Sequence, residues 1–164
     1  MAGGFMDSFR LVSTGIFLPK RKFTSSDTAA KLQFSQSKVE ELAGVKERYF
    51  VTDETAAQMG AQALRNAADQ ARMNLNQIDL ILSASGTQQH PIPSTSCLIQ
   101  KELGLQESGI PCFDINSTCL SFVTALDMAS SLMQTGRYKT IAIVSAEIGS
   151  KALDWNEKES AALI

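Results

Sequence analysis

A strand, a short polar turn and a long helix in succession constrain the fold of this chain more than any other feature. The apolar stretch at residues 110–115 predicts a strand, and small polar residues follow it. A helix is predicted over residues 119–134, and Gly136 ends it. The nearly continuous apolar run at residues 140–146 is typical of a central parallel strand. Strand, helix and strand in this order predict a right-handed crossover in a parallel sheet.

The same alternation extends towards the N-terminus. Helices are predicted at residues 54–72 and 94–103, with a strand at residues 78–84 between them. Upstream, the pattern predicts a first strand at residues 10–19 and two short helices at 24–32 and 37–43. The expected fold class is therefore α/β, with a mainly parallel sheet and flanking helices.

Composition and charge exclude several functions. The formal net charge of −2 leaves no basic face for nucleic acid. No apolar run approaches about 20 residues, so no membrane span is predicted, and the N-terminus lacks the basic and apolar regions of a signal peptide. The three scattered cysteines suit neither a disulfide framework nor a zinc site. We therefore expect a cytoplasmic protein with no nucleic-acid or membrane partner.

The last residues of the chain predict a further strand. Residues 160–164 have the apolar pattern of a strand entry, and the chain stops there. We expect that the chain is one half of a larger protein, and the alternative is a loose terminal tail.

Cys119 is the candidate nucleophile. At a helix N-terminus the free backbone N–H groups favour negative charge, and therefore favour the thiolate over the thiol. The effect is modest, about 0.3–1 kcal/mol, so a strong nucleophile needs a second activator. A small buried hydrophobic residue is the alternative interpretation of Cys119. Cys97, inside a predicted helix, is expected in the core, and Cys112 is expected to be structural.

The remaining residues support few other chemistries. His90, the single histidine, follows a predicted strand and with Cys119 would form a cysteine-hydrolase dyad; an ordinary loop residue is the alternative. The cysteines and His90 lack the local ligand pairs of a metal site, so no metal is expected. The glycine patterns of nucleotide-phosphate loops are absent from the sequence.

Several segments resemble, in the same order, those of the 3-oxoacyl-[acyl-carrier-protein] synthase III family of the thiolase-like superfamily. The nucleophile segment is the DINSTCLSFVTAL of residues 114–126. The other matching segments are GIFLP at 15–19, GVKER at 44–48, IDLI at 78–81, the helix at 93–104, GRYK at 136–139 and SAE at 145–147. The resemblance covers nearly all of residues 10–164 and implies the N-terminal half of a thiolase-like ketoacyl synthase.

The resemblance implies a reaction and a partner half. Cys119 matches the cysteine that accepts an acyl group before decarboxylative condensation with a malonyl thioester, in fatty-acid or polyketide biosynthesis. In the family a histidine and an asparagine from the C-terminal half complete the site, and His90 does not match that histidine. Residues 1–164 would then form the N-terminal domain alone, and we expect that domain to be inactive by itself.

The resemblance also implies the substrates and the assembly. Acyl-CoA or acyl-carrier-protein thioesters are the expected substrates, without a cofactor, and the family implies a homodimer. Lys38 and Leu42 stand where the family has the tryptophan and arginine that hold the CoA adenine. This departure favours a longer acyl donor, a carrier-protein-bound donor or an acyltransferase relative. Ile92 stands where the family often has a phenylalanine that closes the acyl pocket, so Ile92 is the candidate substrate-binding residue; an apolar anchor beside Pro93 is its alternative.

A second function stays open from the sequence. The chain would be a non-catalytic half-domain or scaffold that docks a separate C-terminal half.

Overall fold

The computed structural model describes residues 9–163, which divide into two compact units. Unit 1 contains residues 9–17 and 56–147, and unit 2 contains residues 18–55 and 148–163. Each unit has its own sheet and its own apolar core. Within the described residues, no helix has the length and apolar character that a bilayer span requires.

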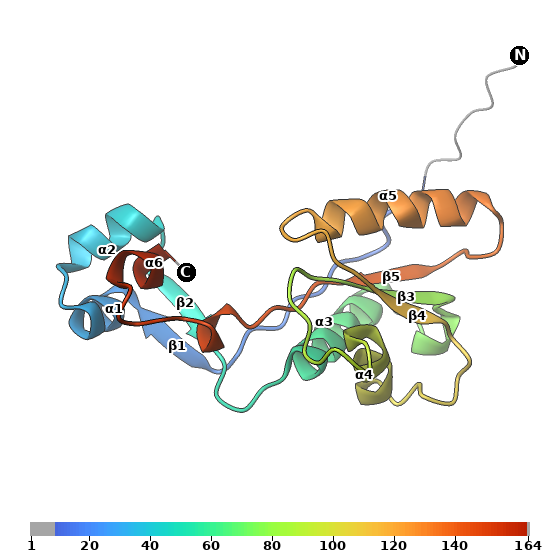
Figure 1. Ribbon diagram of the computed structural model, residues 1–164. Helices are drawn as coiled ribbons and strands as arrows, with labels where there is room; N and C mark the ends of the chain where they lie inside the picture. Colours follow the sequence, from blue (N-terminus) through green and yellow to red (C-terminus); the bar gives the residue numbers. More distant parts are fainter. Residues whose placement is uncertain (1–8, 164) are drawn as a thin grey trace, which may run out of the picture. The chain divides into compact units, whose positions relative to one another are not determined.

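Unit 1 is built on a parallel three-stranded sheet (Figure 1). Strand β3 (Leu80–Ala84) lies in the centre, between β4 (Cys112–Ile115) and β5 (Ile141–Val144). In the register, Leu82 pairs with Phe113 on one side and Ile143 on the other. All five residues of β3 are buried, as expected for a strand covered on both faces. The predicted strands at 78–84, 110–115 and 140–146 are confirmed, each slightly shorter than expected.

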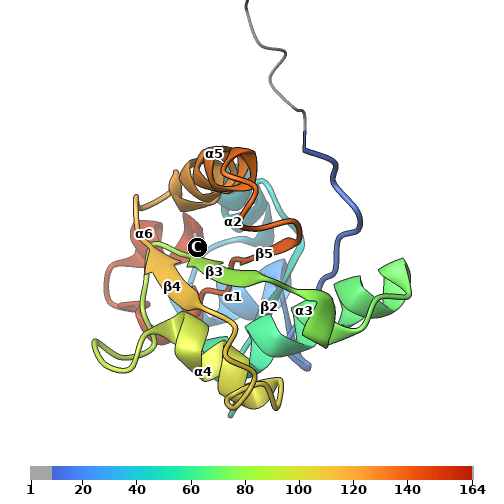
Figure 2. The ribbon, with the colours of Figure 1, turned by 90° about the vertical axis from the view of Figure 1, so that its right-hand side faces the viewer.

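Helices cover both faces of this sheet (Figure 2). Helix α3 (Ala56–Ala71) and helix α4 (Thr95–Glu102) pack on one face, and α5 (Ser121–Gln134) packs on the other. The chain leaves β3 through α4 to reach β4, and then crosses back over β3 through α5 to reach β5. The connection from β3 to β4 and the connection from β4 to β5 run in opposite directions across the sheet. Because both are right-handed, α4 and α5 lie on opposite faces.

Two apolar clusters fill the space between the three layers. The cluster under α3 and α4 is formed by Ala57, Ala61, Leu64, Ile78, Ile81, Ile99, Leu103, Leu105, Ala142 and Val144. The cluster under α5 is formed by Leu80, Leu82, Ala84, Ile115, Ala125 and Ala129. Of β3, Leu80, Leu82 and Ala84 belong to the cluster under α5 and Ile81 to the other, because successive side chains of a strand point to opposite faces.

Residues 9–17 run along α3 without joining a sheet, so the predicted strand at 10–19 is wrong. The Ser13 hydroxyl donates to the Ala67 carbonyl oxygen at 2.8 Å, and the Asn66 amide donates to the Ile16 carbonyl oxygen at 2.8 Å. A Cβ atom on Gly15 would clash with the Ala63 carbonyl oxygen, so this approach requires glycine. Apolar alternation predicts which side of a segment is covered, but a strand also needs a hydrogen-bonded neighbour.

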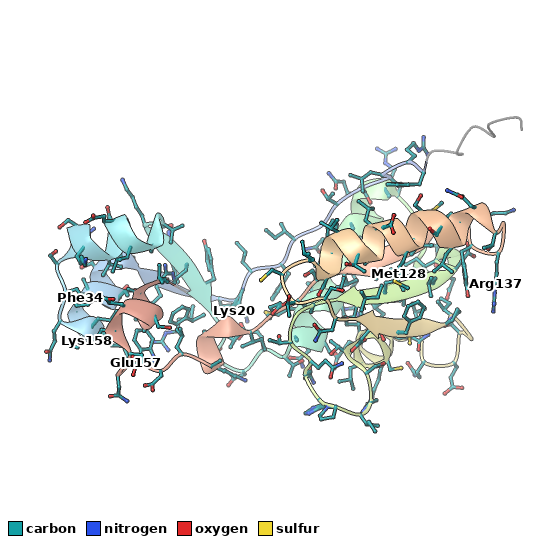
Figure 3. The ribbon with its side chains drawn as sticks, turned by 45° about the horizontal axis from the view of Figure 1, so that its top comes forward. Lys20, Phe34, Met128, Arg137, Glu157 and Lys158 are labelled. Carbon is teal, nitrogen blue, oxygen red and sulfur yellow. The ribbon has the colours of Figure 1, made fainter. Side chains whose placement is uncertain are left out.

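Unit 2 contains a two-stranded antiparallel sheet and three helices. Strand β1 (Arg21–Thr24) pairs with β2 (Glu47–Phe50). The helices are α1 (Ser25–Leu32), α2 (Gln36–Ala43) and α6 (Lys158–Leu163). The rings of Phe23 and Phe50 stack at 4.8 Å, and Trp155 packs beside both. The Lys158 ammonium lies 5.9 Å from the centre of the Phe34 ring (Figure 3). Short 3₁₀ turns at Leu75–Gln77 in unit 1 and Gly149–Lys151 in unit 2 complete the elements.

The predicted strand entry at residues 160–164 is wrong for the described part of that segment. Residues 158–163 form α6, and Ile164 lies outside the described residues. Ala161 and Ala162 are buried against Leu32 of α1. Alanine is the strongest helix former, and two adjacent small side chains allow the short helix to pack closely.

Candidate active site

The carboxyl ends of β3, β4 and β5 meet at one edge of the unit 1 sheet, and Cys119 lies at this edge between β4 and α5. The connections after β3 and β4 lead to helices on opposite faces of the sheet. In open α/β sheets, a crevice for ligands forms where neighbouring connections separate in this way. Cys119 is an exposed free thiol, so its alternative interpretation as a small buried residue is wrong.

A turn with an unusual backbone conformation presents Cys119. Thr118 has a φ of +53°, in the left-handed region that β-branched residues rarely adopt. The Asn116 side-chain oxygen accepts a hydrogen bond from the Thr118 N–H at 3.0 Å, and the Asn116 amide donates to the Gly86 carbonyl oxygen at 3.0 Å. Asn116 therefore stabilises the turn and connects it to the loop that follows β3.

Ser121 holds the turn from the other side. Its hydroxyl accepts from the Ser117 N–H at 2.9 Å and donates to the Thr118 carbonyl oxygen at 2.6 Å. The side chain is only 2% exposed, so no solvent replaces these bonds if the hydroxyl is removed. Sequence analysis missed Asn116 and Ser121 as site residues. The available signal was the presence of residues that form local side-chain-to-backbone bonds on both sides of the cysteine.

Glu147, just after β5, is a third residue that sequence analysis left without a role at this site. Its two carboxylate oxygens accept from the Gly86 N–H at 2.5 Å and the Thr87 hydroxyl at 3.0 Å. The buried Ser85 hydroxyl accepts from the Ala146 N–H at 3.0 Å. Together with the bond from Asn116 to Gly86, these contacts join the ends of all three strands into one hydrogen-bonded network beside Cys119.

The first turn of α5 has no side-chain cap. The helix begins at Ser121, two residues later than the sequence predicted, and Leu120 stands at the N-cap position with φ −92° and ψ 0°. Residues that cap a helix have an extended backbone, so this conformation does not direct a side chain to the first-turn N–H groups. The Ser121 N–H already donates to the Thr118 carbonyl oxygen at 3.1 Å. The Phe122 and Val123 N–H groups that follow have no side-chain cap, and they give the helix end a partial positive charge near Cys119.

The outer face of α5 is apolar and exposed in unit 1. Its buried residues, Ser121, Ala125 and Ala129, lie on the sheet side. The exposed large apolar residues of this part of the chain are Leu120, Phe122, Val123 and Met128. Within the described residues the helix is therefore buried on its sheet side.

Ile92 and His90 lie in the loop between β3 and α4, and both are exposed. The Ile92 side chain is 88% exposed, so it has no packing role within the described chain. Its predicted contact with substrate stays a prediction, as does the dyad of His90 with Cys119. Within residues 9–163, no group of three or more His, Cys, Asp or Glu side chains is arranged to hold a metal ion.

Cys97 is exposed, so its predicted place in the core is wrong. Helix α4 turns Ser96 and Ile99 towards the sheet, and Cys97 falls on the neighbouring face. Its sulfur lies 3.3 Å from the sulfur of half-buried Cys112 at the start of β4. Burial first, and then the contact with Cys97, raise the pKa of the Cys112 thiol to about 11.

An apolar cavity of about 370 Å³ is also present in unit 1. Its walls come from residues 9–15, α3, α5 and β5, including Phe122, Leu126 and Met133 of α5. Cys119 and Ile92 are not among its lining residues. Phe122 in the first turn of α5 and Ser145 just after β5 do line the cavity, so it extends to the carboxyl edge of the sheet without including Cys119.

Comparison with known proteins agrees with the geometry. A family model described as 3-oxoacyl-[acyl-carrier-protein (ACP)] synthase III matches residues 113–164. Beta-ketoacyl-[acyl-carrier-protein] synthase III of Aquifex aeolicus is 34% identical over 154 residues, which is 94% of this chain and 49% of that protein. The enzyme of the same name from Clostridium acetobutylicum is 32% identical over 96% of this chain and 48% of its own length.

A solved structure extends this likeness to three dimensions. The crystal structure of the Aquifex aeolicus 3-oxoacyl-[acyl-carrier-protein] synthase III matches with a TM-score of 0.87, over 93% of this chain and 49% of that chain. The predicted thiolase-like α/β fold is confirmed. The chain spans about half the length of the curated relatives it matches. The chain belongs to the 3-oxoacyl-[acyl-carrier-protein] synthase III family.

Proposed function

We propose that the full-length protein is an acyltransferase that joins acyl thioesters, with Cys119 as its acyl carrier. The main support is the position of exposed Cys119. It follows left-handed Thr118 and lies at the uncapped start of a helix, at the carboxyl edge of a parallel sheet. The family, whose relatives bear the name beta-ketoacyl-[acyl-carrier-protein] synthase III, supports fatty-acid or polyketide condensation as the reaction class.

The first half-reaction loads the cysteine. The Cys119 thiolate attacks the carbonyl carbon of an acyl thioester, and the tetrahedral intermediate carries negative charge on its oxygen. Backbone N–H groups in the first turn of α5, beyond that of Ser121, are suited to donate hydrogen bonds to this oxygen because no side chain caps that helix end. The intermediate collapses with release of the CoA or carrier-protein thiolate, and the acyl group remains on Cys119 as a thioester.

The second half-reaction forms the carbon–carbon bond. A malonyl thioester loses carbon dioxide, and the electron pair left on its α-carbon attacks the acyl carbonyl carbon. The bond to the Cys119 sulfur breaks, the thiolate is regenerated and a 3-oxoacyl thioester is released. The histidine and asparagine that the resemblance assigns to this step match no residue of this chain, so we propose that the remaining half of the protein supplies them.

Partners and substrate contacts are part of the same proposal. Acyl-CoA or acyl carrier protein delivers the acyl group without a cofactor, and Ile92 contacts the acyl chain. The exposed Ile92 side chain supports that role because it is free to meet a ligand or a second subunit. A homodimer is supported by β4, an edge strand of the described sheet with Phe113 37% exposed. The cytoplasmic location stays a prediction.

A mass-spectrometric acylation assay on the full-length protein tests Cys119. We expect one acyl group per chain after incubation with acyl-CoA. The group should map to residues 114–126, a peptide that Asp-specific cleavage releases with Cys119 as its sole cysteine. Cys119→Ala should lose the adduct, and its condensation rate should fall below about one-thousandth of the parent rate. Cys97→Ser, which alters another exposed cysteine, is the control and should keep both the acyl adduct and the condensation rate. An acyl adduct that persists in Cys119→Ala would refute the proposal.

The 164-residue chain alone should form no 3-oxoacyl product from acyl-CoA and malonyl-carrier protein. Product formation by this chain would show that it contains every group that the condensation needs.

The alternative is a non-catalytic half-domain that docks a separate C-terminal half. The exposed apolar face of α5 and the apolar cavity beside it favour docking in either case. The acylation assay separates the two functions, since a scaffold would bind its other half and leave Cys119 without an acyl group.

A further inference from the structure

Cys97 and Cys112 form a pair of free thiols on two elements that pack together. Cys97 is in the first turn of α4, and Cys112 is the first residue of β4. Their sulfur atoms are 3.3 Å apart, and the Gln100 side-chain oxygen accepts a weak hydrogen bond from the Cys112 thiol at 3.5 Å. None of these atoms belongs to the hydrogen-bonded network around Cys119.

We propose that Cys97 and Cys112 are a reversible dithiol–disulfide modification site, oxidised by small disulfides such as oxidised glutathione. A disulfide requires the two sulfurs to approach from 3.3 Å to about 2.05 Å. Side-chain rotation of exposed Cys97 supplies such a movement without displacing a buried residue. In a reducing compartment a disulfide of this kind is transient, which fits a modification and not a permanent structural link.

Exposure assigns the order of the two steps. Cys97 reaches the oxidant first, and its thiolate attacks one sulfur of oxidised glutathione, whose S–S bond breaks and releases one glutathione thiolate. Cys112 then loses its proton, attacks the Cys97 sulfur of the mixed disulfide and releases the second glutathione. Two electrons and two protons pass from the protein thiols to glutathione, so one protein disulfide and two glutathione thiols result. The raised pKa of Cys112 makes it the slower thiol and suits it to the second, intramolecular step.

The bond would fasten α4 to β4 where a carboxylate already joins them. Asp114, two residues after Cys112, accepts hydrogen bonds from the Thr95 and Ser96 N–H groups, both at 2.8 Å. The hydrogen bonds hold the two elements in place before oxidation. The thiols therefore meet because the fold positions them, and the pairing should depend on the folded state.

Peptide mapping after oxidation tests the proposal. The folded chain is incubated with oxidised glutathione, residual thiols are alkylated, and the protein is cleaved by trypsin and an Asp-specific protease. These cuts place Cys97 in residues 79–101, Cys112 in 102–113 and Cys119 in 114–126. We expect residues 79–101 linked to 102–113, with Cys119 alkylated, and the link should disappear with dithiothreitol.

Oxidation of the unfolded chain is the control that shows whether the pairing of Cys97 with Cys112 depends on the fold. In urea, the shortest loop closes most easily, so Cys112 should pair mainly with Cys119. The folded Cys119→Ser variant should still form the Cys97–Cys112 link, and Cys97→Ser should stop at a glutathione adduct or remain reduced. The proposal is overturned if folded protein keeps both Cys97 and Cys112 alkylatable under conditions that oxidise the unfolded chain, or if its main link contains Cys119.

Discussion

Helices α4 and α5 both begin at the carboxyl edge of the unit 1 sheet, yet their first turns are built differently. At α4, Ser94 has an extended backbone and its hydroxyl accepts from the Cys97 N–H. The Asp114 carboxylate accepts from the Thr95 and Ser96 N–H groups of the same turn. At α5, no side chain caps the helix, and Cys119 lies two residues before it. One helix end is closed by the protein itself, and the other remains available to an anionic group.

The difference separates a structural helix end from a functional one. An unsatisfied first turn usually costs stability, and a cap is worth about 1 kcal/mol. In α5 the turn before the helix is stabilised instead, through the side chains of Asn116 and Ser121. The Ser121 N–H donates to the Thr118 carbonyl oxygen, and no side chain caps the N–H groups that follow. The side chains around Cys119 therefore hold its position without occupying the site where substrate charge would develop.

The largest expected effect comes from opening the closed helix end. Asp114→Ala removes two charge-assisted hydrogen bonds that join β4 to α4, and should lower the free energy of unfolding by about 2–4 kcal/mol. Hydrogen exchange of the Thr95 and Ser96 amides measures the local effect. Asp127→Ala removes an exposed carboxylate of α5 and is the matched control, with a change within about 0.5 kcal/mol. Equal losses in the two variants would contradict the role of Asp114 as a cap.

Removing the hydroxyl that holds the Cys119 turn should have the next largest effect. Ser121→Ala leaves the Ser117 N–H without its buried acceptor and should cost about 1–3 kcal/mol. In the full-length protein the rate of Cys119 acylation should fall with it, because the thiol is no longer held in one position. Ser131→Ala, at an exposed site on the same helix, should change neither quantity. Acylation at the parental rate in Ser121→Ala would show that this hydroxyl does not position Cys119.

Exchanging the N-cap residues compares the two helix ends directly. Ser94→Ala should cost about 1 kcal/mol because Ser94 has the backbone conformation of a capping residue. Leu120→Ser should stabilise α5 by less than about 0.5 kcal/mol, because a ψ of 0° turns the new hydroxyl away from the first turn. Urea unfolding followed by circular dichroism measures both changes. If Leu120→Ser raised the free energy of unfolding by about 1 kcal/mol, the backbone conformation at this position would not prevent capping, and the leucine side chain alone would explain the missing cap.

A modest, pH-dependent effect is expected at the opposite edge of the sheet. The Asp79 carboxylate accepts from the Lys139 N–H at 2.7 Å and the Thr140 N–H at 2.9 Å, and these bonds lower the pKa of Asp79 below its usual value of 3.8. Because the folded-state pKa is the lower one, the stabilisation is present above the unfolded-state pKa and is lost as the pH falls through the folded-state pKa.

Asp79→Asn tests this sign. Its deficit in unfolding free energy should be constant near neutral pH and should shrink below about pH 4. The deficit should be at most about 1 kcal/mol because solvent screens the group. Urea unfolding between neutral and acid pH measures this deficit. A deficit that grows on acidification would contradict the lowered pKa of Asp79.

The elements of unit 1 were largely predictable because each has a clear local signal. The strands at 80–84 and 141–144 are apolar runs bounded by polar residues, and the start of α4 follows the capping residue Ser94. The failures have a common cause. Residues 10–17 carry a strand pattern but no ladder partner, and residues 158–163 form a helix because Ala161 and Ala162 pack on Leu32. In both cases contacts distant in the sequence decide the outcome.

The candidate site was predicted only at its centre. Cys119 stands at a strand-to-helix junction that the residue pattern reveals, whereas Asn116, Ser121 and Glu147 have side chains common in any loop. Their roles depend on the direction of single hydrogen bonds, which composition and periodicity do not encode.

The sequence by itself determined the alternation of strands and helices, the parallel sheet and the place of Cys119 before a long helix, because apolar periodicity records which residues face a core. The tertiary structure alone decided which distant residues meet. Glu147 bonds to Thr87 across 60 positions, Asn116 to Gly86 across 30, and Cys97 contacts Cys112 across 15. Such contacts follow from how the strands and helices pack, and no local preference specifies them.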